Sequence, residues 1–151
     1  MNFHVAILMA LIFSGVPALS APTRINDPVV FVTEVLRHFV RRHSYEPPED
    51  IYTPRLAKSI HDDEKQATGE VGCLDFVFWV NGQDWTITKL NVTGGPASQD
   101  REMVIARFLN IGTAEEIHFD FRRVAGRWLL DDVQSVKEPR WTLSEILKCP
   151  H

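Results

Sequence analysis

No charged side chain occurs before Arg24, and this absence is the most informative feature of the chain. Residues 5–19 (VAILMALIFSGVPAL) form an uncharged apolar run, which is shorter than the roughly 20 residues that a membrane-spanning helix needs. The run ends in the small residues expected before a cleavage site. We therefore predict a signal peptide at residues 1–20 and one mature domain at residues 21–151, either periplasmic or secreted. A retained anchor is the alternative, because no Lys or Arg precedes the run.

An excess of basic charge is also absent. The net charge of -4 gives no electrostatic reason to expect binding to nucleic acid or to an anionic membrane. Cys73 and Cys149 are the two cysteines, and neither lies near the predicted cleavage site, where a lipid-anchored bacterial protein carries its acceptor. An even cysteine count in an oxidising compartment favours a disulfide over two buried thiols. We predict a Cys73–Cys149 bridge and no stable membrane anchor after cleavage.

The motifs of several enzyme classes are missing. The chain has no Gly-x-Ser-x-Gly elbow, His-Glu-x-x-His helix, dinucleotide fingerprint or phosphate loop. These absences exclude the common secreted hydrolases on motif grounds. Residues 61–64 (HDDE) have side chains of the type that bind metals, but consecutive helical residues point in different directions. We predict an exposed acidic helix turn there, and neither a metal nor a cofactor for the chain.

Two helices are predicted in the first half of the mature chain. An Asp-Pro pair begins a helix from Asp27 to about His43, and a Thr-Pro pair begins a second helix from Thr53 to about Ala67. The first helix has a one-sided apolar face made of Val29, Val32, Leu36, Phe39 and Val40. The second has only a thin apolar stripe, so it should lie at the surface.

From Cys73 onward the sequence is rich in strand-forming residues. Apolar residues dominate 74–80, and residues 85–93 alternate imperfectly between apolar and polar. A Gly-Gly-Pro loop at 94–96 should separate this strand from the next, at 103–110. Apolar residues occur at both odd and even positions of 103–110, which predicts a central strand covered on both faces.

Residues 116–124 and 127–136 flank an Ala-Gly pair that fits a two-residue hairpin connection. The predicted cross-strand pairs are Phe121 with Leu130, Phe119 with Asp132, Arg123 with Trp128, Arg122 with Leu129, Asp120 with Asp131 and His118 with Val133. This register puts Asp132 on the aromatic, core-facing side. Thr142 then caps a short helix at 143–148, which carries Cys149 to the body of the domain.

Helices ahead of a curved antiparallel sheet indicate an α+β fold with the helices packed on one face of the sheet. Three segments carry a family resemblance: 69–76 (GEVGCLDF), 83–88 (QDWTIT) and 126–133 (GRWLLDDV). They resemble a family of small secreted or lipid-anchored bacterial proteins that contain a domain of unknown function. With the helix beginning at Pro54 and the helix at 143–147, the resemblance covers most of the mature chain. It implies the cone-shaped fold of the nuclear-transport-factor-2-like superfamily, with a pocket between helices and sheet, and no established catalytic residues.

Asp132 is the residue that makes an enzyme conceivable. A carboxylate beside Phe119 on the aromatic face would be partly desolvated, which raises its pKa and suits general acid or base catalysis. The alternative is a structural carboxylate that accepts hydrogen bonds from the backbone, from Arg107 or from Arg123.

Binding residues are a second class of candidate, and we name Asp84, Trp85, Arg107 and Asp132. Asp84 follows Asn-Gly, so it either caps a turn or contacts a ligand. The chain's tryptophans either line an aromatic cage or fill the core; they are Trp79, Trp85, Trp128 and Trp141.

These observations favour a non-enzymatic secreted or periplasmic binding module that recognises an envelope protein or a small apolar ligand. One alternative is an immunity or inhibitor protein that blocks a toxin enzyme through an acidic patch containing Asp120, Asp131 and residues 62–64. The other is a small isomerase-like or dehydratase-like enzyme that uses Asp132.

Overall fold

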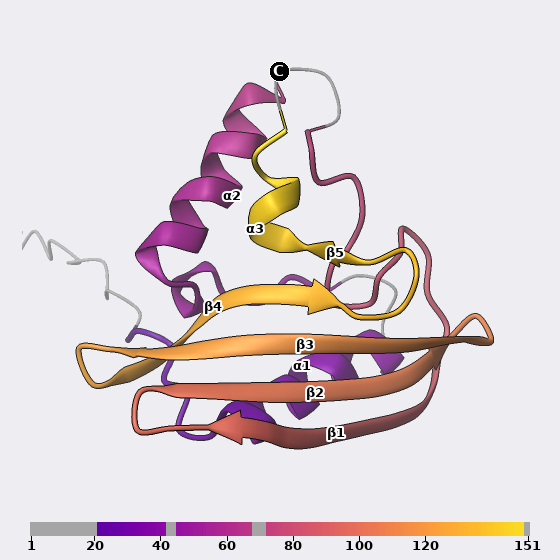
Figure 1. The fold of residues 1–151 in the computed structure, drawn as a ribbon, viewed down its shortest axis with the longest axis horizontal. Coiled ribbons are helices and arrows are strands. Elements are labelled where there is room, and N and C mark those ends of the chain that lie inside the picture. The colour runs from indigo at the N-terminus through magenta and orange to yellow at the C-terminus, as the bar shows by residue number, and fades with distance from the viewer. Residues whose placement is uncertain (1–20, 42–44, 68–71, 150–151) are drawn as a thin grey trace, which may run out of the picture.

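The computed structural model describes residues 21–41, 45–67 and 72–149. The fold is α+β, as predicted, with an open antiparallel sheet whose five strands follow one another in sequence order (Figure 1). The elements are α1 (Pro28–Arg41), the 3-10 helix η1 (Glu49–Ile51), α2 (Pro54–Gln66), β1 (Ile87–Ala97), β2 (Arg101–Asn110), β3 (Thr113–Val124), β4 (Arg127–Ser135), β5 (Trp141–Thr142) and α3 (Leu143–Ile146). The predicted signal peptide lies outside the described residues. Within those residues, no helix is both long and apolar enough to cross a membrane.

Helix α1 packs against one face of the sheet (Figure 1). Its start is as predicted, because an Asp27 carboxylate oxygen accepts a hydrogen bond from the Val30 amide at 3.0 Å. The buried stripe consists of Val32, Val35, Leu36 and Phe39. The prediction that Val40 joins this stripe is wrong: Val40 is 48% exposed. At 3.6 residues per turn its side chain lies roughly 90° from the centre of the stripe.

Helix α2 also begins where the Thr-Pro pair predicts. The Thr53 hydroxyl accepts a hydrogen bond from the Leu56 amide at 3.4 Å, and the Thr53 amide donates to the Leu130 carbonyl at 2.9 Å. This second bond fixes the start of α2 to β4. Leu56 is fully buried while most of the helix surface is exposed, which confirms the predicted surface location.

One face of the sheet supplies much of the core. Alternate residues of β2, β3 and β4 point into it, and those that are fully buried or nearly so are Val104, Ala106, Phe108, Ile117, Phe119, Phe121, Leu130 and Val133. The other face carries no helix of the described chain (Figure 1). The prediction that 103–110 is covered on both faces is therefore wrong. The β2 residues that alternate with the buried ones point to the other face and are half-buried or exposed; the Arg107 side chain is 48% exposed.

Two segments differ from the predicted strand pattern. Residues 74–80 do not form a strand; they lead into a turn closed by an isolated bridge between Val77 and Gly82. This apolar run fills the core as a loop, which periodicity alone does not distinguish from a buried strand. Residues 94–96 are not a loop, because β1 continues through them to Ala97. Since β1 is an edge strand, Pro96 is tolerated there.

The β3–β4 hairpin has the predicted turn. Val124 pairs with Arg127, and both intervening residues have positive φ, 49° for Ala125 and 78° for Gly126, as a type I′ turn requires. The pairs Phe121–Leu130, Arg122–Leu129 and Arg123–Trp128 are confirmed.

Beyond these three pairs a β-bulge shifts the register by one residue. The predicted pairs Phe119–Asp132, Asp120–Asp131 and His118–Val133 are therefore wrong: Phe119 pairs with Val133, Asp120 with Asp132 and His118 with Gln134. A one-residue shift moves side chains to the opposite face of a sheet. Asp132 thus shares a face with Asp120 instead of the buried aromatic residues.

Candidate functional site

A cavity of about 400 Å³ lies between the C-terminal part of α1, residues 45–52, α2 and the loop 74–79. Its volume is within the range of small-molecule sites, and its lining is predominantly apolar and aromatic, as such sites usually are. The aromatic residues of the lining are Phe39, Tyr45, Tyr52, Phe76, Phe78 and Trp79. We refer to this cavity as the aromatic pocket.

Trp79 is a deeply buried residue of the pocket lining, and its indole nitrogen is its one polar side-chain atom. The residue is 2% exposed, and its ring stacks with Phe78 and with Phe119, whose ring centroids are 5.5 and 4.9 Å away. The indole Nε1 is buried and has no hydrogen-bond partner among the described residues. The acceptor beside it is the Tyr52 hydroxyl, towards which the indole acts as a donor.

The Tyr52 hydroxyl lies close to that indole. Burial raises the pKa of Tyr52 to about 12, and the neighbouring Trp79 indole opposes this rise as a nearby donor. The two side chains nevertheless make no hydrogen bond of regular geometry. Tyr52 therefore stays a neutral phenol at physiological pH, with a proton that it can donate.

Carboxylates stand at the rim of the pocket. Glu46, Glu49 and Glu64 are exposed lining residues, and each raises the pKa of Tyr52 further through its negative charge. His61, also exposed, is the basic side chain of the described lining. The electrostatic potential at the pocket mouth is therefore negative at neutral pH.

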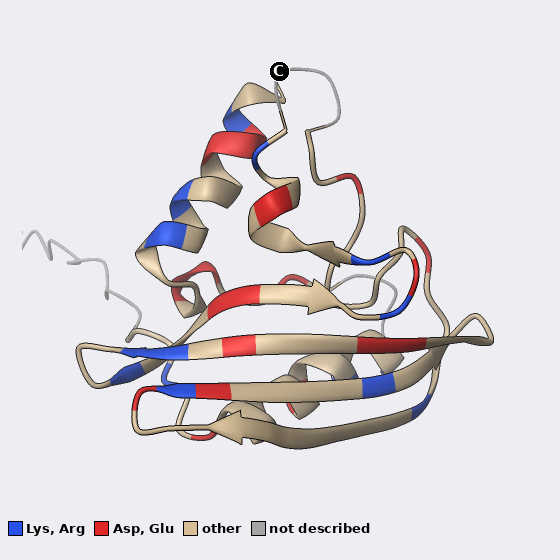
Figure 2. Cartoon of the chain, viewed as in Figure 1, with Lys and Arg blue, Asp and Glu red and all other residues tan. Residues whose placement is uncertain are grey.

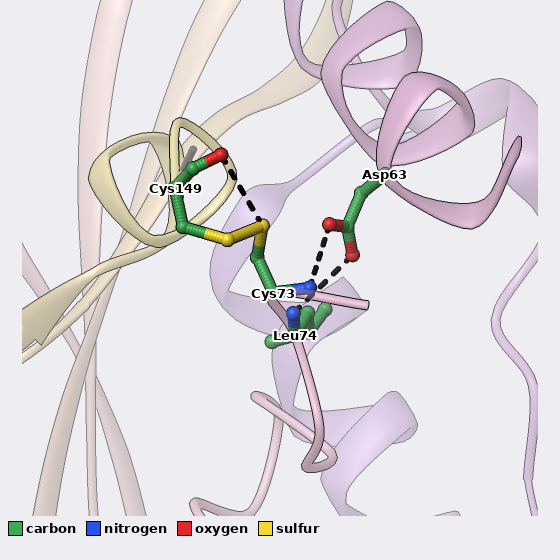
Figure 3. Close-up of a disulfide and its surroundings, with 4 residues drawn as sticks. All are labelled: Asp63, Cys73, Leu74 and Cys149. Carbon is green, nitrogen blue, oxygen red and sulfur yellow. Dashed lines mark hydrogen bonds between the residues drawn. A yellow bond between two sulfur atoms is a disulfide. The ribbon is translucent and has the colours of Figure 1, made fainter. Parts of the chain in front are cut away.

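A disulfide fixes the loop that forms one wall of the pocket (Figure 3). Cys73 is bonded to Cys149, with Cα atoms 5.9 Å apart, which confirms the predicted bridge. The bond joins the start of the loop 74–79 to the chain just after α3. The two segments are 76 residues apart in sequence.

Asp63 holds the same loop from the side of α2 (Figure 3). Its carboxylate accepts hydrogen bonds from the Cys73 amide at 2.8 Å and the Leu74 amide at 3.2 Å. A Cβ atom at Gly72 would lie 2.6 Å from an Asp63 carboxylate oxygen, so glycine permits this close approach. The prediction of an exposed acidic turn is wrong at this position, because Asp63 is only 6% exposed.

Two asparagines hold the turn that follows the pocket loop. The Asn110 side-chain amide donates to the Val80 carbonyl at 3.0 Å, and its oxygen accepts from the Thr86 amide at 3.0 Å. The Asn81 oxygen accepts from the Trp141 indole at 2.8 Å. These bonds tie the turn to β2 and β5.

Asp132 has a structural environment outside the aromatic pocket. It accepts hydrogen bonds from the Ser144 amide at 3.1 Å, from the Ser144 hydroxyl and from the Val133 amide at 2.9 Å. It thereby caps α3, whereas the predicted cap, Thr142, makes no capping bond with its side chain. Its cationic neighbour is Arg55 at 3.9 Å.

The arginines predicted beside Asp132 have other partners. Arg107 forms a two-point ion pair with Glu116, at 2.9 and 3.2 Å, and Arg123 lies over the Trp128 ring, 4.6 Å from its centroid. Hydrogen bonds from His118 and Arg107 lower the pKa of Glu116. The structure thus places Arg107 on the uncovered face of the sheet.

Acidic segments of β3 and β4 lie side by side (Figure 2). Burial and the facing Asp132 raise the pKa of Asp120. Asp131 is bound by the Thr53 hydroxyl at 2.9 Å and by Arg55 at 3.4 Å. Of the patch predicted for toxin binding, Asp131 and Asp63 are thus engaged in internal contacts.

Asp84, Trp85, Arg107 and Asp132 are not among the described residues that line the aromatic pocket. Trp85 supports it from outside, since its indole donates to the Phe39 carbonyl at 3.0 Å. Asp84 is exposed in the turn before β1. Two residues of the site, Tyr52 and Asp63, were not predicted from the sequence as binding residues. A signal for Asp63 exists, because it lies seven positions after Leu56 and so on the same face of α2.

Comparison with known proteins finds no matching protein-family model, no similar curated protein and no similar solved structure.

Proposed function

We propose that this protein is a non-enzymatic binding module, secreted or periplasmic, that holds a small apolar ligand in the aromatic pocket. The observation that carries the proposal is a cavity of about 400 Å³ with a predominantly aromatic lining. A small molecule suits this concave site better than an envelope protein does, because protein interfaces of ordinary stability need a much larger contact surface.

The supports of the pocket favour a preformed site. The loop 74–79 is fixed by the disulfide and by Asp63 on one side, and the turn after it is fixed by Asn110. A preformed cavity spares the ligand part of the cost of ordering the protein, which increases affinity.

The proposal includes the nuclear-transport-factor-2-like cone as the fold. Helices ahead of an antiparallel sheet agree with that architecture. The expected pocket between helices and sheet does not coincide with the aromatic pocket, whose described lining comes from helices and loops. A stable disulfide agrees with an oxidising compartment. The enzyme alternative receives less support, because Asp132 is engaged by Ser144 and Arg55 away from the pocket.

The proposal is tested with N-phenyl-1-naphthylamine, a neutral apolar dye that fluoresces in apolar surroundings. Ala57 lines the pocket from α2, so Ala57→Trp should fill it. We expect dye affinity to fall at least about tenfold, the effect of losing 1.4 kcal/mol of binding free energy. The matched control is Lys58→Trp, since Lys58 is the next residue but is exposed and lies outside the lining.

Circular dichroism melting curves establish that both variants are folded. Equal dye binding by the wild type and both variants would mean that the dye binds elsewhere, and would count against the pocket. Loss of binding in Ala57→Trp alone supports it.

A further inference from the structure

The mouth of the aromatic pocket carries three carboxylates without a counter-charge. Glu46, Glu49 and Glu64 line the pocket and are exposed. None of them forms an ion pair with the described part of the chain. On the same helix as Glu64, by contrast, Asp62 is paired with Lys58. Negative charge thus accumulates at this opening, where it attracts a positively charged ligand.

Basic residues of the lining do not cancel this charge. The part of the lining that the structure describes contains no Lys or Arg, and His61 is its basic side chain. Histidine is ordinarily uncharged at pH 8. The lining is then negative overall.

Aromatic rings stand among these carboxylates. Tyr45 directly precedes Glu46, and Tyr52 follows Glu49 in the same segment. Both tyrosines and Phe76 line the pocket and are half-buried, so part of each side chain is accessible to a ligand. The face of an aromatic ring attracts cations, and proteins recognise quaternary ammonium groups with aromatic cages. The ring type and the charge of the lining therefore favour the same class of ligand.

Two of these rings are held by residues outside the described lining. Tyr45 stacks on His38, with ring centroids 4.3 Å apart. Phe76 packs edge-on against Trp141, with ring centroids 5.2 Å apart. Rings that are already ordered spare the ligand the cost of ordering them, which increases affinity.

The geometry favours an organic cation over a metal ion. Within the described residues, no group of His, Cys, Asp or Glu side chains is placed to hold a metal. A bare ion would also leave the apolar walls of a cavity of about 400 Å³ without contacts. An ammonium group spreads its charge over several substituents, which suits carboxylates distributed around a rim.

Resting on the proposed function, we infer that the aromatic pocket binds apolar molecules that carry one organic cation, a protonated amine or a quaternary ammonium group. The cationic head lies among Tyr45, Tyr52 and the three rim carboxylates. The apolar body packs against Phe39 and Phe78, two buried aromatic residues of the lining. Fatty acids and other amphipathic anions are repelled by the rim.

Three benzyl alcohols with para substituents of nearly the same shape test the inference. The substituents are trimethylammonium, tert-butyl and sulfonate, so the charge changes while the body stays the same. Displacement of N-phenyl-1-naphthylamine at pH 8 gives their affinities for the oxidised, full-length protein. We expect the ammonium compound to bind at least about tenfold more tightly than the tert-butyl compound, and the sulfonate to bind more weakly than both.

The hydrophobic effect cannot produce this order, because the ammonium head is more strongly hydrated than the tert-butyl head. Salt provides a check on the electrostatic origin. Raising the salt concentration from about 0.01 M to about 1 M shortens the Debye length from about 30 Å to about 3 Å. The preference for the ammonium compound should shrink accordingly.

A combined variant attributes the preference to the rim. Glu46→Gln, Glu49→Gln and Glu64→Gln together remove its charges and keep the side-chain shapes. We expect the preference for the ammonium over the tert-butyl compound to fall at least about threefold. The matched control makes the same change in net charge at exposed positions outside the described lining, and it should keep the preference: Glu34→Gln, Glu138→Gln and Glu145→Gln.

A second pair of variants tests the aromatic contribution. Tyr45→Leu removes the ring and should lower the preference more than Tyr45→Phe, which keeps it. Circular dichroism melting curves establish that each variant is folded. The wild-type protein provides an independent measurement: the N-methyl proton resonance of the ammonium compound should move upfield on binding, because aromatic rings shield protons above their faces.

The outcomes distinguish this inference from the proposed function. If neither the dye nor any of the three compounds binds up to about 1 mM, the weak end of useful affinity, both are wrong. Equal affinities for the ammonium and tert-butyl compounds overturn the cation preference but leave an apolar binding pocket. Tightest binding of the sulfonate, or a cation preference that survives the combined rim variant, contradicts the role of the rim carboxylates.

Discussion

Removal of the Cys73–Cys149 disulfide should cost between about a third and nine-tenths of the stability of an ordinary domain. The bridge closes a loop with a sequence separation of 76 residues. The chain-entropy treatment of loop closure then gives an entropy loss in the unfolded chain of about 15 cal/mol/K, or about 4.5 kcal/mol at 25 °C. Natural domains have only about 5–15 kcal/mol in total.

The perturbation is the double variant Cys73→Ala, Cys149→Ala. Cys149 is exposed and Cys73 is half-buried, so the substitution removes little packing and mainly frees the unfolded chain. With an m-value of about 2 kcal/mol/M, the urea midpoint should fall by about 2 M. Tryptophan fluorescence and circular dichroism should report the same transition if unfolding is two-state.

The structure also predicts where the variant loosens first. Asp63 still holds the amides of residues 73 and 74 through its carboxylate, whereas the chain after α3 loses its covalent link. Hydrogen exchange should therefore accelerate at residues 147–149 more than at residues 73 and 74. Adding Asp63→Ala should abolish this difference.

Wild-type protein treated with a reductant is the control, and its midpoint should match that of the double variant. A double variant within about 1 kcal/mol of the oxidised wild type would refute the reasoning. It would mean that the unfolded chain is already restricted without the bridge, contrary to the assumption behind the entropy estimate.

The remaining predictions concern three carboxylates. Asp132→Ala should lower the free energy of unfolding by about 2 kcal/mol, because the cap of α3 and the bond from the Ser144 hydroxyl are lost. Asp132→Asn keeps an acceptor, so thermal unfolding should show a much smaller loss of stability, and ligand binding should be unchanged. Burial and Asp132 raise the folded-state pKa of Asp120 above its ordinary value of 3.8. Wild-type stability should therefore fall as pH rises from 3.8 to the folded-state pKa. Asp120→Asn should be more stable than wild type at neutral pH, by up to about 1 kcal/mol, and equally stable near pH 3. Glu116 has a lowered pKa, so Glu116→Gln should be less stable than wild type at neutral pH, and the deficit should vanish as pH falls through the folded-state pKa. An Asp120→Asn variant less stable than wild type at pH 7 would contradict the assigned like-charge repulsion with Asp132.

Features encoded by neighbouring residues could be predicted from the sequence. The starts of α1 and α2 depend on Asp27 and Thr53, whose side chains cap amides only three positions away. The β3–β4 turn depends on Ala125 and Gly126, which adopt the positive φ angles of a tight hairpin. Each of these features depends on a few neighbouring residues that can adopt few conformations, so the local residue types determine it.

The bulge in β4 could not be predicted in this way. Simple alternation places Asp132 opposite Phe119, and no Gly or Pro near Asp131 marks an extra residue. The bulge is stabilised by contacts from α2, because Asp131 is bound by Thr53 and Arg55. A residue 78 positions away in sequence thus helps to determine which face Asp132 occupies.

The aromatic pocket also could not be predicted from local sequence patterns. Its lining comes from loops and from α1 and α2, whereas the predicted binding residues Arg107 and Asp132 lie on β2 and β4. Its walls are positioned by links between distant residues: Cys73 with Cys149, and Asn110 with Val80. Ligand binding should therefore be measured on oxidised, full-length protein, in which the links that position the pocket walls are intact.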